Sequence, residues 1–156
     1  MFKAIFAQIP NSITCLNLIS GCIAIVMAFK GCYGWASIAI AAAAVFDFLD
    51  GAMARLMKAY SAVGKELDSL SDLVSFGVAP AAMVYNILPE EYSWIAISIP
   101  VCGALRLARF NVDTRQTTSF IGLPIPANAI FWIGAVSWME ANGPFDAWIM
   151  IPATML

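Results

Sequence analysis

The sequence predicts an all-α integral membrane protein, with six transmembrane helices forming one domain over residues 1–156. Of its residues 62% are hydrophobic and only 12% are charged, whereas soluble domains are near half apolar and about a quarter charged. Long continuous apolar runs predict helices, because strands of a membrane barrel would show alternating apolar and polar residues. The length suits one compact domain and is too short for two.

Six apolar segments follow one another, separated by Gly, Pro or charged residues. A helix of about 20 residues crosses the hydrocarbon core, so the first four segments are long enough. The fifth is marginal unless residues 122–126 are partly embedded. The sixth ends with the chain, and we expect this last helix to be truncated. The segments are Ile13–Phe29, Tyr33–Met57, Leu67–Leu88, Tyr92–Asn111, Ile125–Glu140 and Phe145–Leu156.

The first twelve residues differ from the spans in being amphipathic. Residues 1–12 are expected to lie along the membrane surface with Lys3 in the interface. Asn11 and Ser12 come directly before the first apolar run and are candidate helix caps. The run Ile13–Phe29 is longer than the core of a signal peptide, so a first transmembrane helix is the favoured interpretation.

The basic residues predict the orientation. With the N-terminus in the cytoplasm, seven of the eight lysines and arginines lie on the cytoplasmic side, and only Lys30 lies outside. Five tryptophans, at 35, 94, 132, 138 and 148, are expected to form belts at the membrane interfaces. The seven cytoplasmic residues are Lys3, Arg55, Lys58, Lys65, Arg106, Arg109 and Arg115.

Composition also excludes several functions. A net charge of −2 provides no basic field, so nucleic acid is not an expected partner. The chain contains no histidine, which excludes histidine bases, Ser-His-Asp triads and histidine-bound zinc. The four cysteines lack CxxC spacing and are expected to be small buried apolar side chains. Catalysis would therefore depend on carboxylates, lysine, arginine or thiols.

Acidic residues gather where the second and third segments meet. At about 100° per residue, Asp47 and Asp50 share one side of the second helix, and Asp68 and Asp72 share one side of the third. A short turn between antiparallel helices would bring the two pairs face to face. The same helix sides carry Gly51, Ala54, Arg55 and Gly64.

Four carboxylates at this depth need compensating charge. Each costs roughly 2.5–3.5 kcal/mol near the membrane centre on insertion scales, and Arg55 and Lys65 cannot neutralise four. Two hard divalent ions, Mg²⁺ or Mn²⁺, are suited to carboxylate oxygens and to phosphate substrates. An acid-lined cation channel or transporter, or a non-catalytic membrane scaffold, remains as an alternative.

The spacing D-x-x-D-G-x-x-A-R, eight residues, then G-x-x-x-D-x-x-x-D resembles the signature of the CDP-alcohol phosphotransferase family, with every fixed position filled. The resemblance implies six transmembrane helices, a homodimer and a cavity that faces the cytoplasm. It implies that Asp47, Asp50 and Asp68 bind metal, and that Asp72 completes the metal site and acts as general base. It also implies that a CDP site includes the four residues Gly51, Ala54, Arg55 and Gly64.

Softer matches in the flanking segments, 10–17, 104–111 and 122–127, resemble the membrane-integral phosphatidylserine synthases of that family. They imply transfer of the phosphatidyl group of CDP-diacylglycerol to L-serine, with release of CMP. Glycerol-3-phosphate or inositol phosphate remains possible as the acceptor, and a diether remains possible as the lipid.

Four further polar residues are candidates for binding. Arg106 and Arg109 share a helix face and either anchor the helix at the interface or hold an anionic group, such as the serine carboxylate or a lipid phosphate. Thr14 and Asn17, on the first span, either hydrogen-bond the nucleotide or serve helix packing.

Overall fold

The protein is described by a computed structural model in which residues 2–57, 61–112 and 124–143 are placed, with side chains from Pro10 onward. Every element in these ranges is helical, as the composition predicted. The elements are α1 (Phe2–Phe29), α2 (Tyr33–Leu56), α3 (Ala62–Asp72), the π-helical η1 (Leu73–Val78), α4 (Ala79–Ile87), α5 (Glu90–Ser93), the 3₁₀-helical η2 (Trp94–Ile97), α6 (Ser98–Val112) and α7 (Ile125–Asn142).

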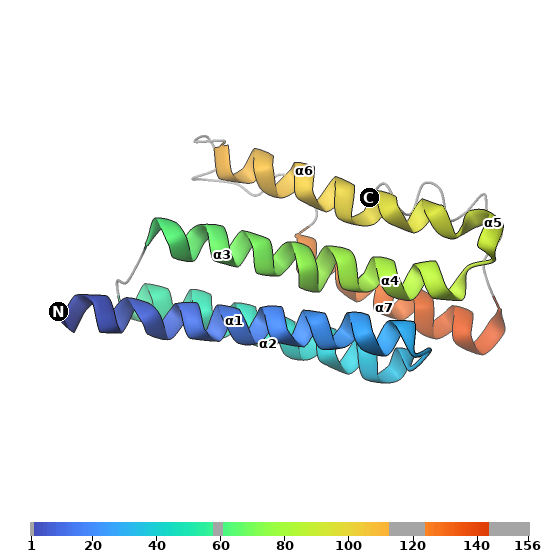
Figure 1. Cartoon of the computed structure of the whole chain (residues 1–156), viewed down its shortest axis with the longest axis horizontal. Helices are drawn as coiled ribbons and strands as arrows, with labels where there is room; N and C mark the ends of the chain where they lie inside the picture. The colour runs from blue at the N-terminus through green and yellow to red at the C-terminus, as the bar shows by residue number, and fades with distance from the viewer. Residues whose placement is uncertain (1, 58–60, 113–123, 144–156) are drawn as a thin grey trace.

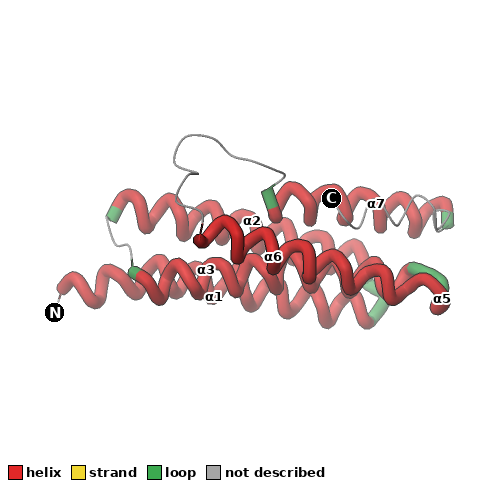
Figure 2. Tube along the Cα trace, turned by 90° about the horizontal axis from the view of Figure 1, so that it is seen from above, coloured by secondary structure: helices red, strands yellow, loops and turns green. Residues whose placement is uncertain are grey.

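Several of these elements join into long helical runs that form an antiparallel bundle. The central run consists of α3, η1 and α4, and it lies between α1 and α6 (Figure 1). α2 packs along α1, and α7 covers α4 and part of α2 (Figure 2). Four runs in the described chain are long and apolar enough to cross a membrane: 10–29, 33–56, 62–87 and 90–112.

The predicted segments end within two residues of the observed helices, and the larger differences are at some of their beginnings. α2 and α7 begin at the predicted residues, but the central run begins at Ala62, five residues before the predicted Leu67. Ser61 causes the early start, because its Oγ accepts a hydrogen bond from the backbone N–H of Gly64 at 2.9 Å and caps the helix. The predicted last helix, Phe145–Leu156, and its truncation lie outside the described residues.

The caps predicted at Asn11 and Ser12 are wrong. α1 is helical from Phe2 to Phe29 and continues through Pro10, so both residues lie inside it. A proline inside a helix removes one backbone hydrogen bond. The helix nevertheless continues, and the carbonyl oxygen of Pro10 accepts a hydrogen bond from the Thr14 hydroxyl at 3.0 Å.

Small residues on α1 allow the central run to approach closely. Gly21, Ala24 and Ala28 are buried at helical spacing on one side of α1. A Cβ atom on Gly21 would lie 2.8 Å from the Cα of Ser75 and would also collide with the Ser75 hydroxyl. At the far end of the same interface, Asn86 Nδ2 donates to the carbonyl oxygen of Ala28 at 2.7 Å. Close backbone contact and side-chain hydrogen bonds are the interactions that hold helices together in lipid.

Two expectations about side-chain exposure are wrong. Trp132 is fully buried against the core on α7 and therefore belongs to no interfacial belt. Cys15, Cys22 and Cys32 are exposed on the helices or the first turn, although small apolar side chains were expected to be buried. Both errors have one cause: in a bundle surrounded by lipid, hydrophobicity does not distinguish inward from outward faces.

The approach of α1 to Ser75 yields a stability prediction. Gly21→Ala should lower the free energy of unfolding by about 1–3 kcal/mol, because the added methyl group overpacks the interface. The matched control is Gly34→Ala, since a Cβ at that helical position meets nothing within 4 Å. We expect the control to be neutral or stabilising by up to about 1 kcal/mol. Thermal unfolding in detergent measures both, and equal melting temperatures would contradict the close approach.

Candidate active site

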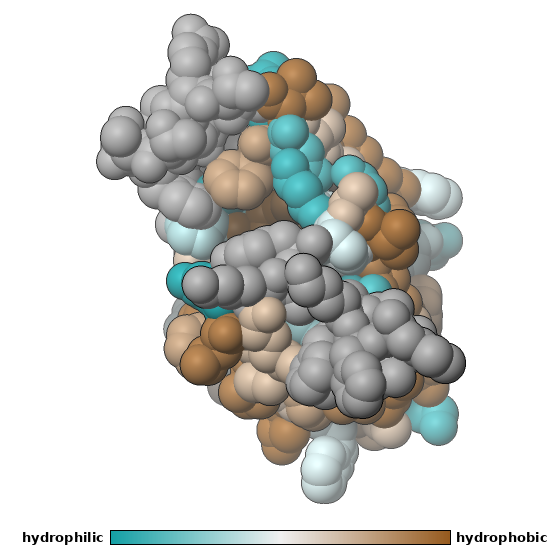
Figure 3. Space-filling model, turned by 90° about the vertical axis from the view of Figure 1, so that its left-hand side faces the viewer, coloured by the Kyte–Doolittle hydropathy of each residue, from teal (hydrophilic) through white to brown (hydrophobic). Residues whose placement is uncertain are grey.

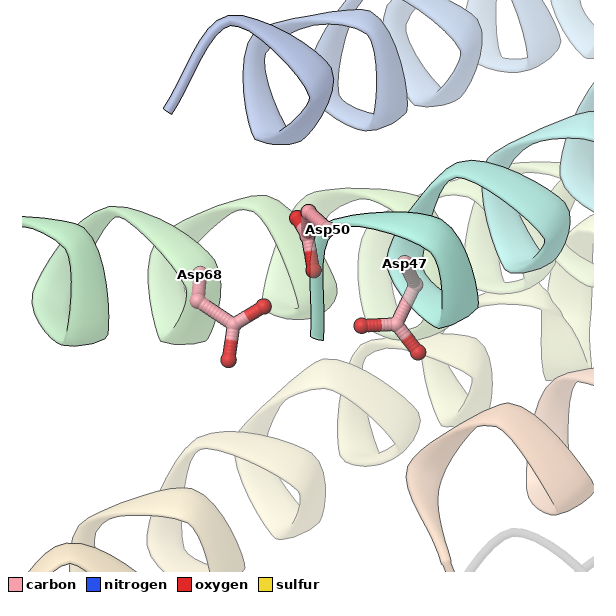
Figure 4. Close-up of side chains that lie close together, drawn as sticks. All are labelled: Asp47, Asp50 and Asp68. Carbon is pink, nitrogen blue, oxygen red and sulfur yellow. The ribbon is translucent and has the colours of Figure 1, made fainter. Parts of the chain in front are cut away.

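Three carboxylates from two helices meet near one end of the bundle. Asp47 and Asp50 lie one turn apart near the end of α2, and Asp68 lies on α3. One carboxylate oxygen from each lies within 4.8 Å of the other two. In Figure 4 the three side chains lie in a row with Asp50 in the middle. The expectation that the acidic sides of the two helices face each other is therefore confirmed for these three residues.

Asp72, one turn deeper on α3, is the fourth acidic residue of the site. Its carboxylate lies close enough to Asp47, Asp50 and Asp68 for their charges to interact. Its Oδ1 accepts a hydrogen bond from Asn17 Nδ2 at 3.2 Å. Asp72 thus lies beside the three-residue cluster and contacts α1 at the same time.

α1 provides neutral polar side chains to the acidic site. Thr14 and Asn17 are buried on the same face of α1, one turn apart. The Thr14 hydroxyl donates to the carbonyl oxygen of Pro10 at 3.0 Å, and its side chain lies near Asp50. The two residues predicted as possible nucleotide contacts therefore both lie beside the aspartates.

The described part of the chain supplies no positive charge that pairs with the aspartates. Within the described ranges no lysine or arginine pairs with any of the four aspartates. Asp50 is only 5% exposed, and its Oδ2 has no hydrogen-bond partner among the described residues. An ionised carboxylate that is buried without a partner is costly. Hard oxygen ligands, an unpaired buried acceptor and uncompensated negative charge together fit a divalent ion such as Mg²⁺ or Mn²⁺.

The small residues predicted for a CDP site differ in their surroundings. A Cβ on Gly51 would meet only the Arg55 guanidinium, at 3.7 Å, so this side of α2 is open. Ala54 is partly exposed on the next turn. Gly64 instead packs closely, since a Cβ there would lie 2.8 Å from Asn11 Oδ1. Gly64 thus allows α3 to begin against α1, which explains the absence of a side chain without any ligand.

Arg55 is exposed at the end of α2, where its Nε donates to the carbonyl oxygen of Gly51 at 3.0 Å. The guanidinium is therefore folded back along its own helix, over the open side at Gly51.

The end of α6 is tied to α3 by a polar link that sequence reasoning missed. Asn111 Nδ2 donates to Ser69 Oγ at 3.0 Å, and Lys65 Nζ donates to the carbonyl oxygen of Asn111 at 3.4 Å. No spacing rule connects residues about forty positions apart on different helices, so the sequence carried no signal for this link. It places the last turns of α6, with half-buried Arg106 and exposed Arg109, at the acidic end of the bundle.

Polar residues concentrate at this end. Viewed from the N-terminal end of α1, hydrophilic side chains gather on the end face while hydrophobic ones line the flanks (Figure 3). The acidic site thus lies near a polar surface and not at the middle of the apolar bundle.

Comparison of the sequence with known protein families supports the family resemblance. The sequence pattern of the CDP-alcohol phosphatidyltransferase family matches residues 7–156, nearly the whole chain. The chain belongs to this family. The family resemblance inferred from eight spaced residues is therefore confirmed.

Several family members share more than a third of their aligned residues with the chain. A CDP-diacylglycerol–serine O-phosphatidyltransferase of Methanocaldococcus jannaschii is 44% identical over 81% of this chain and 59% of its own length. One of Mycobacterium leprae is 40% identical over 86% of this chain and 49% of its own length. An archaetidylserine synthase of Methanothermobacter thermautotrophicus is 38% identical over 97% of this chain and 67% of its own length. The chain thus spans about half to two thirds of these relatives.

The geometry predicts that divalent-ion binding depends on the converging aspartates. Asp68→Asn should weaken Mn²⁺ binding by about 10- to 100-fold, because it removes one charged ligand from the cluster. Glu66→Gln is the matched control, since Glu66 is exposed on the same helix and outside the cluster. Titration of the purified protein followed by electron paramagnetic resonance measures both affinities. Equal affinities in the two variants would exclude Asp68 as a ligand.

Proposed function

We propose that this protein is a phospholipid-synthesising transferase that moves the phosphatidyl group of CDP-diacylglycerol to the hydroxyl of L-serine, giving phosphatidylserine and CMP. Convergence of the family's aspartates on two adjacent helices is the observation that carries the proposal. Serine as acceptor is supported by the names of the relatives. The archaeal relative named for archaetidylserine keeps a diether lipid open as the donor.

The proposed reaction forms one bond and breaks one. The serine hydroxyl oxygen bonds to the phosphorus that carries the lipid, while the phosphoanhydride bond to CMP breaks. Asp72 is the general base that receives the hydroxyl proton. An aspartate is a weak base for an alcohol, so alignment of the reacting groups must supply most of the rate.

The aspartates also hold the proposed cofactor. Asp47, Asp50 and Asp68 hold divalent ions, two Mg²⁺ or Mn²⁺ in our proposal, and Asp72 completes the set. Ions held there would supply positive charge to the diphosphate and to the leaving CMP. The donor set supports this role, since the carboxylates have no basic partner in the described chain.

Residues around the aspartates bind the two substrates. Gly51 and Ala54 leave room for the CDP group beside α2, and Arg55 pairs with its diphosphate. Gly64 shapes the same region through its close contact with α1. Arg106 and Arg109, carried on α6 to this end of the bundle, bind the serine carboxylate or a lipid phosphate.

The wider architecture follows the family. We propose one catalytic domain over residues 1–156, six transmembrane helices, a homodimer, and an N-terminus and active site that face the cytoplasm. The long apolar helices of the described chain support membrane integration. The positive-inside rule supports the orientation, because Arg55, Lys65, Arg106 and Arg109 lie at the acidic end while Lys30 lies at the other.

Activity with different acceptors tests the proposal. Purified protein with CDP-diacylglycerol, Mn²⁺ and L-serine should release CMP and form phosphatidylserine, identified by mass spectrometry. Asp72→Asn should lower kcat by at least about 100-fold, because removal of a general base costs 10²–10⁴-fold. Glu66→Gln should retain activity. If CMP is released with glycerol-3-phosphate or inositol phosphate and not with serine, that compound is the acceptor in place of serine. Cation flux in liposomes without CMP release would indicate a channel.

Labelling of cysteines tests the orientation. Cys32 lies in the turn between α1 and α2, at the end opposite the aspartates. It should react in intact cells with a membrane-impermeant maleimide. In a background with all four cysteines replaced by serine, Ser61→Cys at the start of α3 should react only after the membrane is permeabilised. The reverse pattern would place the active site on the outer side.

A further inference from the structure

We propose that Asn17 is a positioning residue that holds Oδ1 of Asp72, so that the other carboxylate oxygen is presented to the substrate. This inference rests on the proposed function, because it assigns Asn17 a part in proton removal by Asp72. It differs from the expectation that Asn17 contacts the nucleotide directly.

The hydrogen bond between the two side chains is the first observation. Asn17 Nδ2 lies 3.2 Å from Asp72 Oδ1, and the two residues come from different helices, α1 and α3. A carboxylate offers only acceptors, so the amide nitrogen must be the atom that faces it. One of the two N–H donors of Asn17 is therefore used by Asp72 before any substrate arrives.

The second observation is that the backbone around Asn17 is held in place. Ser75 Oγ donates to the carbonyl oxygen of Asn17 at 3.0 Å, and both groups are buried. One turn further along α1, Gly21 lets the backbone of Ser75 approach directly. Ser75 lies in η1, the π-helical turn that begins immediately after Asp72. The same short segment thus carries the carboxylate and holds the residue that orients it.

The third observation is that Asn17 is costly as a packing residue. Its side chain is 0% exposed, and its Oδ1 has no hydrogen-bond partner among the described residues. An unpaired buried acceptor lowers stability, whereas an apolar side chain of similar volume, such as leucine, would not. The carboxamide is therefore best explained by the interaction of its nitrogen with Asp72.

Fixing one oxygen restricts rotation of the carboxylate. A base must lie within hydrogen-bonding distance of the proton it removes, with its lone pair directed at it. Outer residues that orient reactive or metal-bound groups typically contribute 10- to 100-fold in activity or metal affinity. Loss of the Asn17 donor should therefore affect the chemical step and leave binding of the nucleotide largely intact.

The test compares Asn17→Leu with the wild-type protein. At saturating Mn²⁺ we expect kcat to fall about 10- to 100-fold, while the Kd for CDP at the same Mn²⁺ concentration changes by less than about threefold. Ser75→Ala keeps the carboxamide but removes its backbone anchor, and should lower kcat by a smaller factor. Ser71→Ala is the matched control and should keep full activity, because Ser71 is buried on the same run but donates only to Leu67 of its own helix.

A second measurement asks whether Asn17 acts through Asp72. Mn²⁺ affinity, measured by electron paramagnetic resonance, should fall with Asn17→Leu when Asp72 is present and should not fall further in an Asp72→Asn background. Equal losses in both backgrounds would overturn the proposal. So would a Kd for CDP that rises by the same factor as kcat falls, since this identifies a nucleotide contact.

The remaining outcomes distinguish a failure of the positioning role of Asn17 from a failure of the proposed transferase function. If Asn17→Leu does not fold, Ser75→Ala decides: full activity in that variant overturns the positioning role. An active wild-type protein with unchanged kcat in Asn17→Leu also overturns it and leaves the proposed function standing. A wild-type protein that releases no CMP with any acceptor contradicts the proposed function itself.

Discussion

Uncompensated negative charge at one end of an apolar bundle is the constraint on which this structure depends. Asp47, Asp50 and Asp68 bring carboxylate oxygens within 4.8 Å of one another without a basic partner in the described chain. Such an arrangement is stable only near a polar surface or with bound cations. The bundle provides the first condition by placing the aspartates at its polar end. The donor set is suited to the second, since it fits a hard divalent ion.

The close packing of α1 against the central run serves the same site. Gly21 and Gly64 remove side chains where α1 meets Ser75 and the start of α3. These contacts place Thr14 beside Asp50 and Asn17 beside Asp72. The first span is therefore more than a membrane anchor. It supplies a neutral hydrogen-bond donor, the Asn17 amide, to the acidic site.

The sequence predicted the acidic cluster because four aspartates at helical spacing allow few arrangements once a short turn joins their helices. It predicted the helices α2 and α7 because continuous apolar runs define them. It did not predict the partner of Asn17, which lies 55 positions away, or the link between Asn111 and Ser69. Contacts of this kind depend on helix rotation, and hydrophobicity does not determine rotation when lipid surrounds the bundle. The burial of Trp132 was missed for the same reason.

A neutral donor beside Asp72 suits the proposed chemistry better than a charged one. An arginine or lysine at position 17 would form a charge-assisted pair with the carboxylate. Such a pair would compete with a divalent ion for the same oxygens and reduce their attraction for a proton. The Asn17 amide occupies one oxygen without cancelling the charge. The carboxylate is thereby oriented, and its negative charge remains available to the proposed cation and acceptor hydroxyl.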